Sequence, residues 1–408
     1  MSGNHGGNDY WIIKLDNNGI LQWQKSLGGS LDDIAYSVDQ VLDGGYVIAG
    51  KSNSNDGDVT NHHGSSMYYD SWIVKLDTNG NIEWQNSIGG NNDDIGLSIK
   101  QTSDGGFIVG GNSWSNDGDV TGHHGPTDNQ YEWNPDQWIV KLNSFGIIQW
   151  QKSFGGTGDD RVGSVEETDD GGYIIGGSSW SNDGDITGHK SRSDYWIVKI
   201  NIIGDIQWEK SFGGSGDDFA GNIKQTIDKG YIITGQSTSN DGDVIGNINN
   251  FNGLDGDYWI VKLDSNGNLK WQKSLGGTYN ESSHSIQQTN DGGYIIAGAS
   301  FSNDGNITDH HGSTNFSDYW IVKLSSDKMS TQDSQNAITK IYPNPAKNII
   351  NFSEEVSNIK ISDFSGKIIN QISTYEKSIN VSKLKKGTYI FSATSKSGEI
   401  INKKFIKE

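Results

Sequence analysis

Asp318-Tyr-Trp-Ile-Val-Lys-Leu324 is the sixth copy of one phrase in this chain. The earlier copies lie at 9–15, 71–76, 137–142, 194–200 and 257–263, and their tryptophans are 61, 66, 58, 63 and 61 residues apart. In five copies a second tryptophan follows the first by 12 residues. A fixed period of this size indicates a repeat architecture. Most of the prominent residues recur because the fold recurs. Residues with a binding or catalytic role are therefore expected where the copies differ.

Composition and charge narrow the classes of function. The chain has 408 residues, 55 of them Gly, and only 32% are hydrophobic, which is typical of short strands joined by tight turns. Residues 338–408 hold 12 Lys against 6 Asp and Glu, so the rest of the chain holds 19 basic against 45 acidic side chains. Nucleic-acid binding needs a basic surface, and this acidic body therefore excludes it.

Other classes are excluded by missing features. The chain has no cysteine, so it has no disulfide, thiol catalysis or thiolate metal site. The sequence contains no stretch of about 18 apolar residues, so no transmembrane helix is predicted. The first nine residues lack the basic and apolar regions of a signal peptide.

A single repeat, residues 206–263, predicts four short strands. Strand-like stretches lie at 206–212, 220–226, 231–237 and 257–263, separated by Gly-Gly, by a turn of the Asp-Gly-Gly type and by an Asn-Asp-Gly-Asp loop. No helical periodicity is present. This layout predicts an all-β fold made of propeller blades.

The phrase Leu-Asp-x-x-Gly-x-x-x-Trp at 15–23, 76–84 and 263–271 resembles the tryptophan-docking motif of quinoprotein-like propellers. The resemblance implies that these indoles pack on the neighbouring blade, with no catalytic role. If the strand at 20–27 closes the last blade, about five blades form and the strand at 10–15 is left over. We expect a six-bladed parent that is truncated at its N-terminus. The indoles given the packing role are Trp23, Trp84, Trp150, Trp208 and Trp271.

After Leu324 the composition changes. We expect propeller repeats at 1–325, a polar linker at 326–337 and a separate domain at 338–408. The motifs Tyr342-Pro-Asn-Pro345, Ile361–Lys367 and Leu384–Ile390, with a Lys-rich ending, resemble the C-terminal sorting domain of type IX secretion in Bacteroidetes-type bacteria.

That resemblance implies a small Ig-like β-sandwich and export by the type IX secretion machinery. The product would be secreted, or attached to lipopolysaccharide at the outer-membrane surface. The motif residues carried over are Pro343, Asn344, Pro345, Gly366 and Gly387.

The Asn-Asp-Gly-Asp sequence recurs in the loops between second and third strands. Closely spaced Asp oxygens around a Gly are ligand types that Ca²⁺ prefers, although the spacing is not that of an EF-hand. The alternative is a repeated turn whose Asp side chains accept backbone N–H groups. Calcium is the one cofactor considered, and its candidate ligands are Asp56, Asp58, Asp117, Asp119, Asp183, Asp185, Asp241, Asp243 and Asp304.

Two further polar patterns are interpreted as structural. Asp-Asp pairs follow Gly-Gly in four copies, and adjacent strand residues point to opposite faces, so a catalytic dyad is disfavoured. Eight of the nine histidines lie in or near the second-to-third-strand loops. A transition-metal site there is the alternative to polar loop residues.

Aromatic residues that break the repeat are the candidate ligand-binding residues. Trp114 and Trp180 occupy a position that other copies fill with Asn, Thr or Phe, and the insertion at 126–136 adds Tyr131 and Trp133. Exposed loop aromatics suit sugar stacking. The alternative is that the indoles cover the edge of a sheet.

We therefore expect a secreted or surface propeller that binds or scaffolds a partner, with glycan as the ligand class. We expect it to be a monomer and not an enzyme. The alternative is a polysaccharide-acting hydrolase or lyase with its site at the propeller channel. An enzyme would concentrate non-equivalent polar residues at the channel mouth, whereas a binder varies in its outer loops, where the variation is found.

Overall fold

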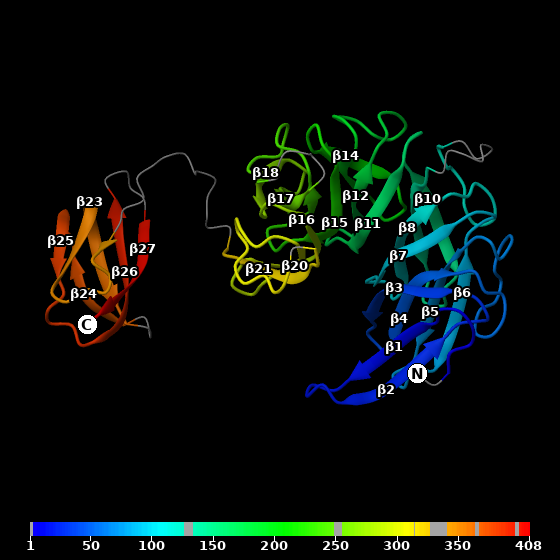
Figure 1. Ribbon diagram of the computed structural model, residues 1–408, viewed down its shortest axis with the longest axis horizontal. Helices are drawn as coiled ribbons and strands as arrows, with labels where there is room; N and C mark the ends of the chain where they lie inside the picture. The colour runs from blue at the N-terminus through cyan, green and yellow to red at the C-terminus, as the bar shows by residue number, and fades with distance from the viewer. Residues whose placement is uncertain are drawn as a thin grey trace. The chain divides into compact units, whose positions relative to one another are not determined.

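The computed structural model describes residues 3–125, 134–248, 255–313, 315–326, 341–363, 367–395 and 400–408. The chain divides into two compact units, Met1–Ser330 and Thr331–Glu408 (Figure 1). Every regular element of the described residues is a strand, so the predicted all-β class is confirmed. The described residues contain no helix long and apolar enough to span a membrane.

The first unit is a row of six antiparallel sheets in its described residues. Four sheets have four strands in sequence order, the first sheet has two strands and the last has three. This succession confirms the predicted propeller blades. The strands are β1 (Tyr10–Leu15), β2 (Leu21–Leu27), β3 (Asp33–Gln40), β4 (Tyr46–Ser52), β5 (Asp70–Leu76), β6 (Ile82–Ile88), β7 (Asp94–Gln101), β8 (Phe107–Ser113), β9 (Asp136–Leu142), β10 (Ile148–Phe154), β11 (Asp160–Glu167), β12 (Tyr173–Ser179), β13 (Asp194–Ile200), β14 (Ile206–Phe212), β15 (Asp218–Gln225), β16 (Tyr231–Ser237), β17 (Asp257–Leu263), β18 (Leu269–Leu275), β19 (Glu281–Gln288), β20 (Tyr294–Ser300) and β21 (Asp318–Leu324).

The repeated phrase forms β1 in the first sheet and the third strand of each later sheet, and it is buried at all seven positions in β5, β9, β13 and β17. A third strand pairs with a strand on each side, while its faces pack on the neighbouring sheets. Its tryptophan is held within the sheet, as in the 2.9 Å hydrogen bond that Trp259 Nε1 donates to Gln272 Oε1. Burial on both faces explains why the phrase is apolar throughout instead of alternating.

The lysine of the phrase ties each third strand to the Asp-Gly-Gly turn. Lys262 is fully buried, and its Nζ lies 2.9 Å from Asp228 Oδ1 and 3.0 Å from the carbonyl oxygen of Leu263. The same pairing joins Lys141 to Asp104 at 3.0 Å. A buried ammonium needs both a carboxylate and carbonyl acceptors, so the two motifs recur together.

The second tryptophan of each repeat joins one sheet to the next. Trp150 Nε1 donates to the carbonyl oxygen of Ile202 at 3.2 Å, in the turn that follows the next third strand. The indole of Trp84 lies so close to Gly146 that a Cβ there would be 2.7 Å from the ring, and Gly146 has φ +77°. The packing implied by the tryptophan-docking resemblance is therefore present.

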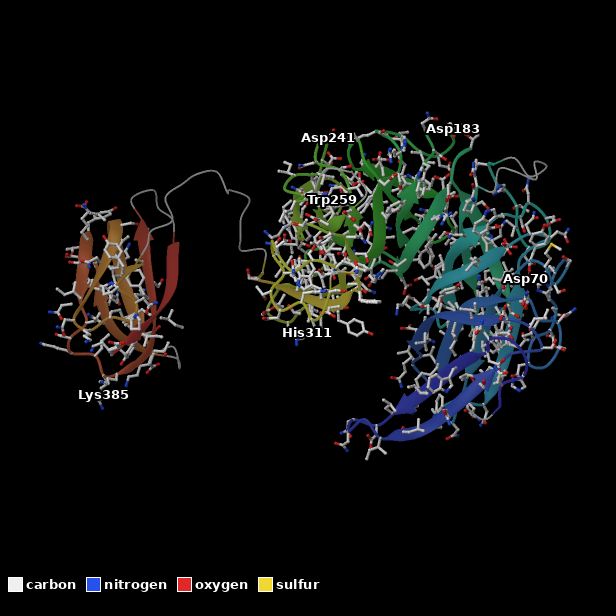
Figure 2. All side chains as sticks on the ribbon, in the orientation of Figure 1. Asp70, Asp183, Asp241, Trp259, His311 and Lys385 are labelled. Atoms are coloured by element: carbon white, nitrogen blue, oxygen red, sulfur yellow. The ribbon has the colours of Figure 1, made fainter. Side chains whose placement is uncertain are left out.

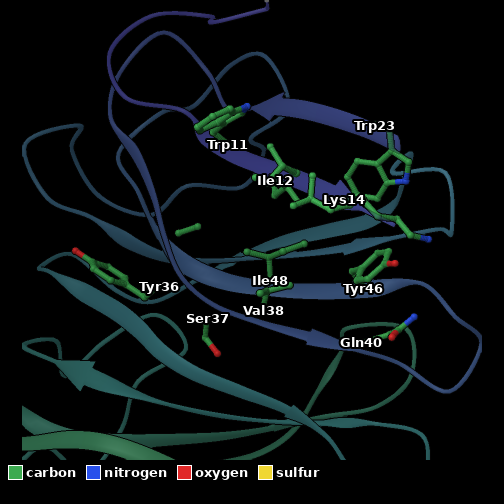
Figure 3. A pocket seen from close by; sticks show the side chains of 13 residues that line it. Trp11, Ile12, Lys14, Trp23, Tyr36, Ser37, Val38, Gln40, Tyr46 and Ile48 are labelled. Atoms are coloured by element: carbon green, nitrogen blue, oxygen red, sulfur yellow. The ribbon is translucent and has the colours of Figure 1, made fainter. Parts of the chain in front are cut away.

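The two ends of the row differ from the expectation. β2 pairs with β1 and not with β21, so the last sheet keeps three strands among the described residues. A groove of about 670 Å³ lies between β1 and β3, lined by Trp11, Ile13, Tyr36 and Val38 among others (Figure 3). Val38 is 57% exposed there, whereas its counterpart Ile99 is buried. In front of a complete sheet this space is filled by the first two strands of the preceding sheet, as β3 and β4 fill it beside β7.

The second unit is built around one apolar core. Its strands are β22 (Ile341–Tyr342), β23 (Ile349–Ser362), β24 (Ile368–Ile372), β25 (Glu376–Asn380), β26 (Gly387–Ser395) and β27 (Ile400–Lys407). β23 is one long strand, and it pairs with β22 and β25 near its start and with β24 and β26 further on. The buried side chains include Phe352, Phe391 and Phe405, which fits the predicted Ig-like sandwich.

Candidate functional site

The candidate site is the set of loops that join the second and third strands of the sheets, called here the loop face. These loops span residues 53–69, 114–135, 180–193, 238–256 and 301–317. Asp183 and Asp241 lie in two of them, and Asp70 begins the third strand that follows the first of them (Figure 2).

The aspartates of each Asn-Asp-Gly-Asp sequence accept hydrogen bonds from the Gly-Gly turn that precedes the first strand of the same sheet. Asp117 Oδ1 accepts a hydrogen bond from the backbone N–H of Asn91 at 2.8 Å, and Asp119 Oδ2 accepts one from Gly89 at 3.3 Å. Gly118 has φ +61°, and a Cβ on it would lie 2.4 Å from the carbonyl oxygen of Gly89. The same pair of acceptor contacts is made by Asp56 and Asp58, by Asp183 and Asp185, and by Asp241 and Asp243, while Asp304 makes the first of them.

These contacts give the aspartates a turn-stabilising role. Among the described residues, no three His, Asp or Glu side chains gather in a way that could hold a metal ion. Calcium binding at the candidate ligands therefore stays a prediction from the sequence.

A pair of buried carboxylates lies beneath each Gly-Gly turn. Asp160 begins β11 and Asp136 begins β9, and a Cβ on Gly155 would lie 2.7 Å from an oxygen of each. Both side chains are buried, and burial raises the pKa of Asp160 to about 6. In the preceding pair, burial raises the pKa of Asp94 to about 7 against the opposing hydrogen bonds of Ser113, Gly90 and Ser115. Two facing carboxylates cannot both ionise without cost.

The loop histidines lie next to the carboxylates that begin the third strands. His124 Nδ1 lies 2.8 Å from Asp136 Oδ2, and this hydrogen bond raises the pKa of His124. His123 lies 3.6 Å from the same oxygen, and burial lowers its pKa. His62 and His63 repeat the arrangement at Asp70, and His310 and His311 repeat it at Asp318. The histidines thus act as carboxylate partners in the described loops, as the polar-loop interpretation expects.

The predicted ligand-binding aromatics are only partly described. Trp180 follows β12 and is half-buried, and its ring lies 5.3 Å from that of Phe219 on the next sheet. Trp114 has the same place after β8 and is also half-buried. Tyr131 and Trp133 lie outside the described residues, as does Gly366 of the sorting motif. Trp114 and Trp180 therefore lie on neighbouring sheets of one face, each with an accessible part.

The structure adds a row of charges that sequence reasoning missed. The seventh residues of β3, β7, β11 and β15 are Asp39, Lys100, Glu166 and Lys224, and they alternate in sign. Lys100 Nζ lies 2.6 Å from Asp39 Oδ1, and Lys224 Nζ lies 3.6 Å from Glu166 Oε2. Burial raises the pKa of Glu166, although Lys224 opposes the shift. The available signal was the variation at one position among otherwise similar first strands. Because these charges are paired, they hold sheets together and offer no free acid or base.

The sorting motif of the second unit lies against its last strand. Asn344 Oδ1 accepts a hydrogen bond from the backbone N–H of Ile406 at 2.9 Å, and the N–H of Ala346 donates to the Ile406 carbonyl oxygen at 2.8 Å. The Pro-Asn-Pro segment is therefore fixed beside β27. Gly387 begins β26, the neighbour of β27.

Comparison with known proteins identifies the second unit. Residues 340–408 match the family described as the secretion system C-terminal sorting domain. No curated protein sequence matches the chain. This domain is the type IX sorting signal, so the protein is exported to the cell surface or beyond it.

Solved structures similar to the chain are distant. They include the WD40 domain of Pan2 from Neurospora crassa (12% identity, TM-score 0.39, 91% of this chain and 88% of that one). They also include PorZ of Porphyromonas gingivalis, a surface component essential to type IX secretion (12%, TM-score 0.23, 94% and 61%), and Sqt1 of Chaetomium thermophilum (9%, TM-score 0.35, 91% and 87%). The chain spans 61% of PorZ. The propeller assignment accordingly rests on the sheet topology of the chain itself.

Proposed function

We propose that this exported propeller is a glycan-binding module that uses its loop face. The observation that carries the proposal is the placement of Trp114 and Trp180 after equivalent strands of neighbouring sheets, where the other copies have no tryptophan. An indole that keeps an accessible face stacks on a sugar ring at little conformational cost. The sheets hold both backbones rigidly, which favours binding because little entropy is lost.

The loops can hold this shape by themselves. Their aspartates already accept the backbone N–H groups of the Gly-Gly turns, so the loop face needs no ion to stay ordered. We expect binding to persist in EDTA, and loss of binding in EDTA would instead support calcium at the Asn-Asp-Gly-Asp loops.

The test is a glycan-array assay on the full chain in Ca²⁺ and in EDTA, with Trp114→Ala and Trp180→Ala. Each variant should lose affinity by about tenfold or more, which corresponds to about 1.4 kcal/mol. Phe145→Ala is the matched control, because Phe145 is an exposed aromatic in a turn after β9, outside the loop face. Absence of binding by the unmodified chain in both buffers would exclude the proposal.

A further inference from the structure

A second feature at the loop face is a cluster that contains aromatic rings and the two arginines of the chain. Arg161 and Arg192 are the only arginines in 408 residues. Their side chains are 51% and 60% exposed; Arg192 lies in the loop 180–193, and Arg161 lies in the neighbouring strand β11. Other copies have Ile, Phe or Ser at the position of Arg161, so the arginine is not required by the repeat.

A series of contacts runs through the first part of this cluster. Arg161 binds Asp159 through two hydrogen bonds, Nε to Oδ1 at 2.7 Å and Nη2 to Oδ2 at 2.6 Å. The backbone N–H of Trp180 donates to the carbonyl oxygen of Asp159 at 2.9 Å, and the Trp180 ring contacts Phe219. These contacts fix the Arg161–Asp159 pair and join the backbone of Asp159 to that of Trp180, whose ring packs on Phe219.

The other side of the cluster repeats this chemistry. Arg192 Nη1 donates to Asp217 Oδ2 at 3.2 Å, and Asp217 precedes Phe219 by two residues, as Asp159 precedes Arg161. Arg161 holds in β11 the position that Phe219 holds in β15, so the repeat relates Arg161 to Trp114 as it relates Phe219 to Trp180.

We propose that the cluster of Asp159, Arg161, Trp180, Arg192, Asp217 and Phe219 is a subsite for an uncharged sugar. This inference rests on the proposed function and names its ligand class. The aromatic rings supply the stacking surface, while each Arg–Asp pair presents N–H donors beside carboxylate acceptors. That combination matches the hydroxyl groups of a sugar ring, which both donate and accept.

The charges favour a neutral ligand over an acidic one. Each guanidinium of the cluster is already matched by a carboxylate, and nearby Lys190 is paired with Asp243. No uncompensated cation is therefore offered by these described side chains to a uronic or sulfated sugar. The acidic body, with 45 acidic against 19 basic residues, repels anionic chains further.

The experiment compares the full chain with Trp180→Ala, Arg161→Gln and Phe145→Ala on neutral, uronic and sulfated oligosaccharides, by array and then calorimetry. Far-UV circular dichroism and melting temperature establish that each variant is folded. We expect saturable binding to neutral oligosaccharides, an affinity loss of about tenfold or more for Trp180→Ala and Arg161→Gln, and no change for Phe145→Ala.

The adverse outcomes separate the subsite from the function. Glycan binding that both cluster variants retain would overturn the subsite while leaving a glycan-binding propeller. Binding to acidic sugars alone would overturn the ligand class. No binding by the unmodified chain would overturn the proposed function, and the subsite with it.

Discussion

The hydroxyl of Tyr195 donates a 2.9 Å hydrogen bond to the carbonyl oxygen of Trp259, one sheet further along the chain. Their rings lie 4.5 Å apart, and both side chains are buried. Tyr10 makes the same contact with Trp72, and Tyr258 makes it with Trp320. The first aromatic of the repeated phrase therefore binds the second aromatic of the next copy, which gives the phrase a role between sheets as well as within them.

Tyr195→Phe should lower the free energy of unfolding by about 1–3 kcal/mol. The substitution removes the hydroxyl and leaves the Trp259 carbonyl oxygen short of one buried donor. Urea unfolding followed by tryptophan fluorescence measures the loss. Tyr319→Phe is the matched control, because Tyr319 has the same place in the last sheet and is 96% exposed. Equal effects at the two positions would contradict the role assigned to the contact.

Gly146→Ala should destabilise the chain more than Gly188→Ala. Both glycines have similar left-handed backbone angles, φ +77° and φ +75°, so the backbone penalty is shared. A Cβ at Gly146 would meet the ring of Trp84, whereas one at Gly188 has nothing within 4 Å. The difference in melting temperature therefore reports the docking of Trp84. If the two variants melt together, close packing against the indole contributes no stability.

Stability should rise as the pH falls from 8 to about 5. Burial raises the pKa of Asp94 and Asp257 to about 7, and the pKa of Asp160, Asp194 and Asp218 to about 6, all above the unfolded value of 3.8. The folded chain therefore takes up protons between pH 8 and 5 that the unfolded chain does not, and the stability they add is lost again as the pH rises through 6 and 7. Melting temperatures across this range provide the check, and a flat or falling profile on acidification would contradict it.

Below that range the sign should reverse. Burial opposes the shift at Asp104, but hydrogen bonds from Thr102, Gly106 and Lys141 lower its pKa to about 2. Its contribution is present above pH 3.8 and is lost as the pH falls toward 2. The profile should therefore pass through a maximum. Asp104→Asn should weaken the decline on the acid side and leave the rise between pH 8 and 5 unchanged.

Removal of residues 338–408 should keep the protein inside its cell. The match of residues 340–408 to the sorting domain makes this unit the export signal, while the propeller unit has its own cores. In a host with type IX secretion, immunoblots of the medium, cell surface and periplasm would locate the full chain and the shortened one. Equal amounts of both at the surface would show that export does not depend on the unit.

The strands were predictable because the repeat displays each of them several times. Residues 206–212, 231–237 and 257–263 were expected to be strands and are β14, β16 and β17. The partner of β2 was not predictable, because β1 and β21 carry nearly the same phrase and either could pair with it. The sequence pattern predicts where each strand lies, whereas the choice between two similar partner strands depends on how the sheets pack.

The candidate site was predicted less completely. Trp180 could be singled out because it breaks the repeat, but its contact with Phe219 joins residues 39 positions apart on different sheets. Arg161 had the same signal of irregularity within a strand. Because strand residues of a repeat usually serve the fold, variation inside a strand does not by itself indicate a binding residue.

Each contact between sheets described above joins one repeat to the next. Examples are the contacts of Tyr195 with Trp259, of Trp150 with Ile202 and of Lys100 with Asp39. A row held in this way behaves as a one-dimensional cooperative chain, in which an inner repeat loses two neighbours on melting and an end repeat loses one. Denaturation should therefore begin as fraying at β1 and at β21, where Trp11 is 50% and Ile321 is 65% exposed. Amide hydrogen exchange would then grade protection from the ends toward β9 and β13, and each added repeat would lengthen the protected interior.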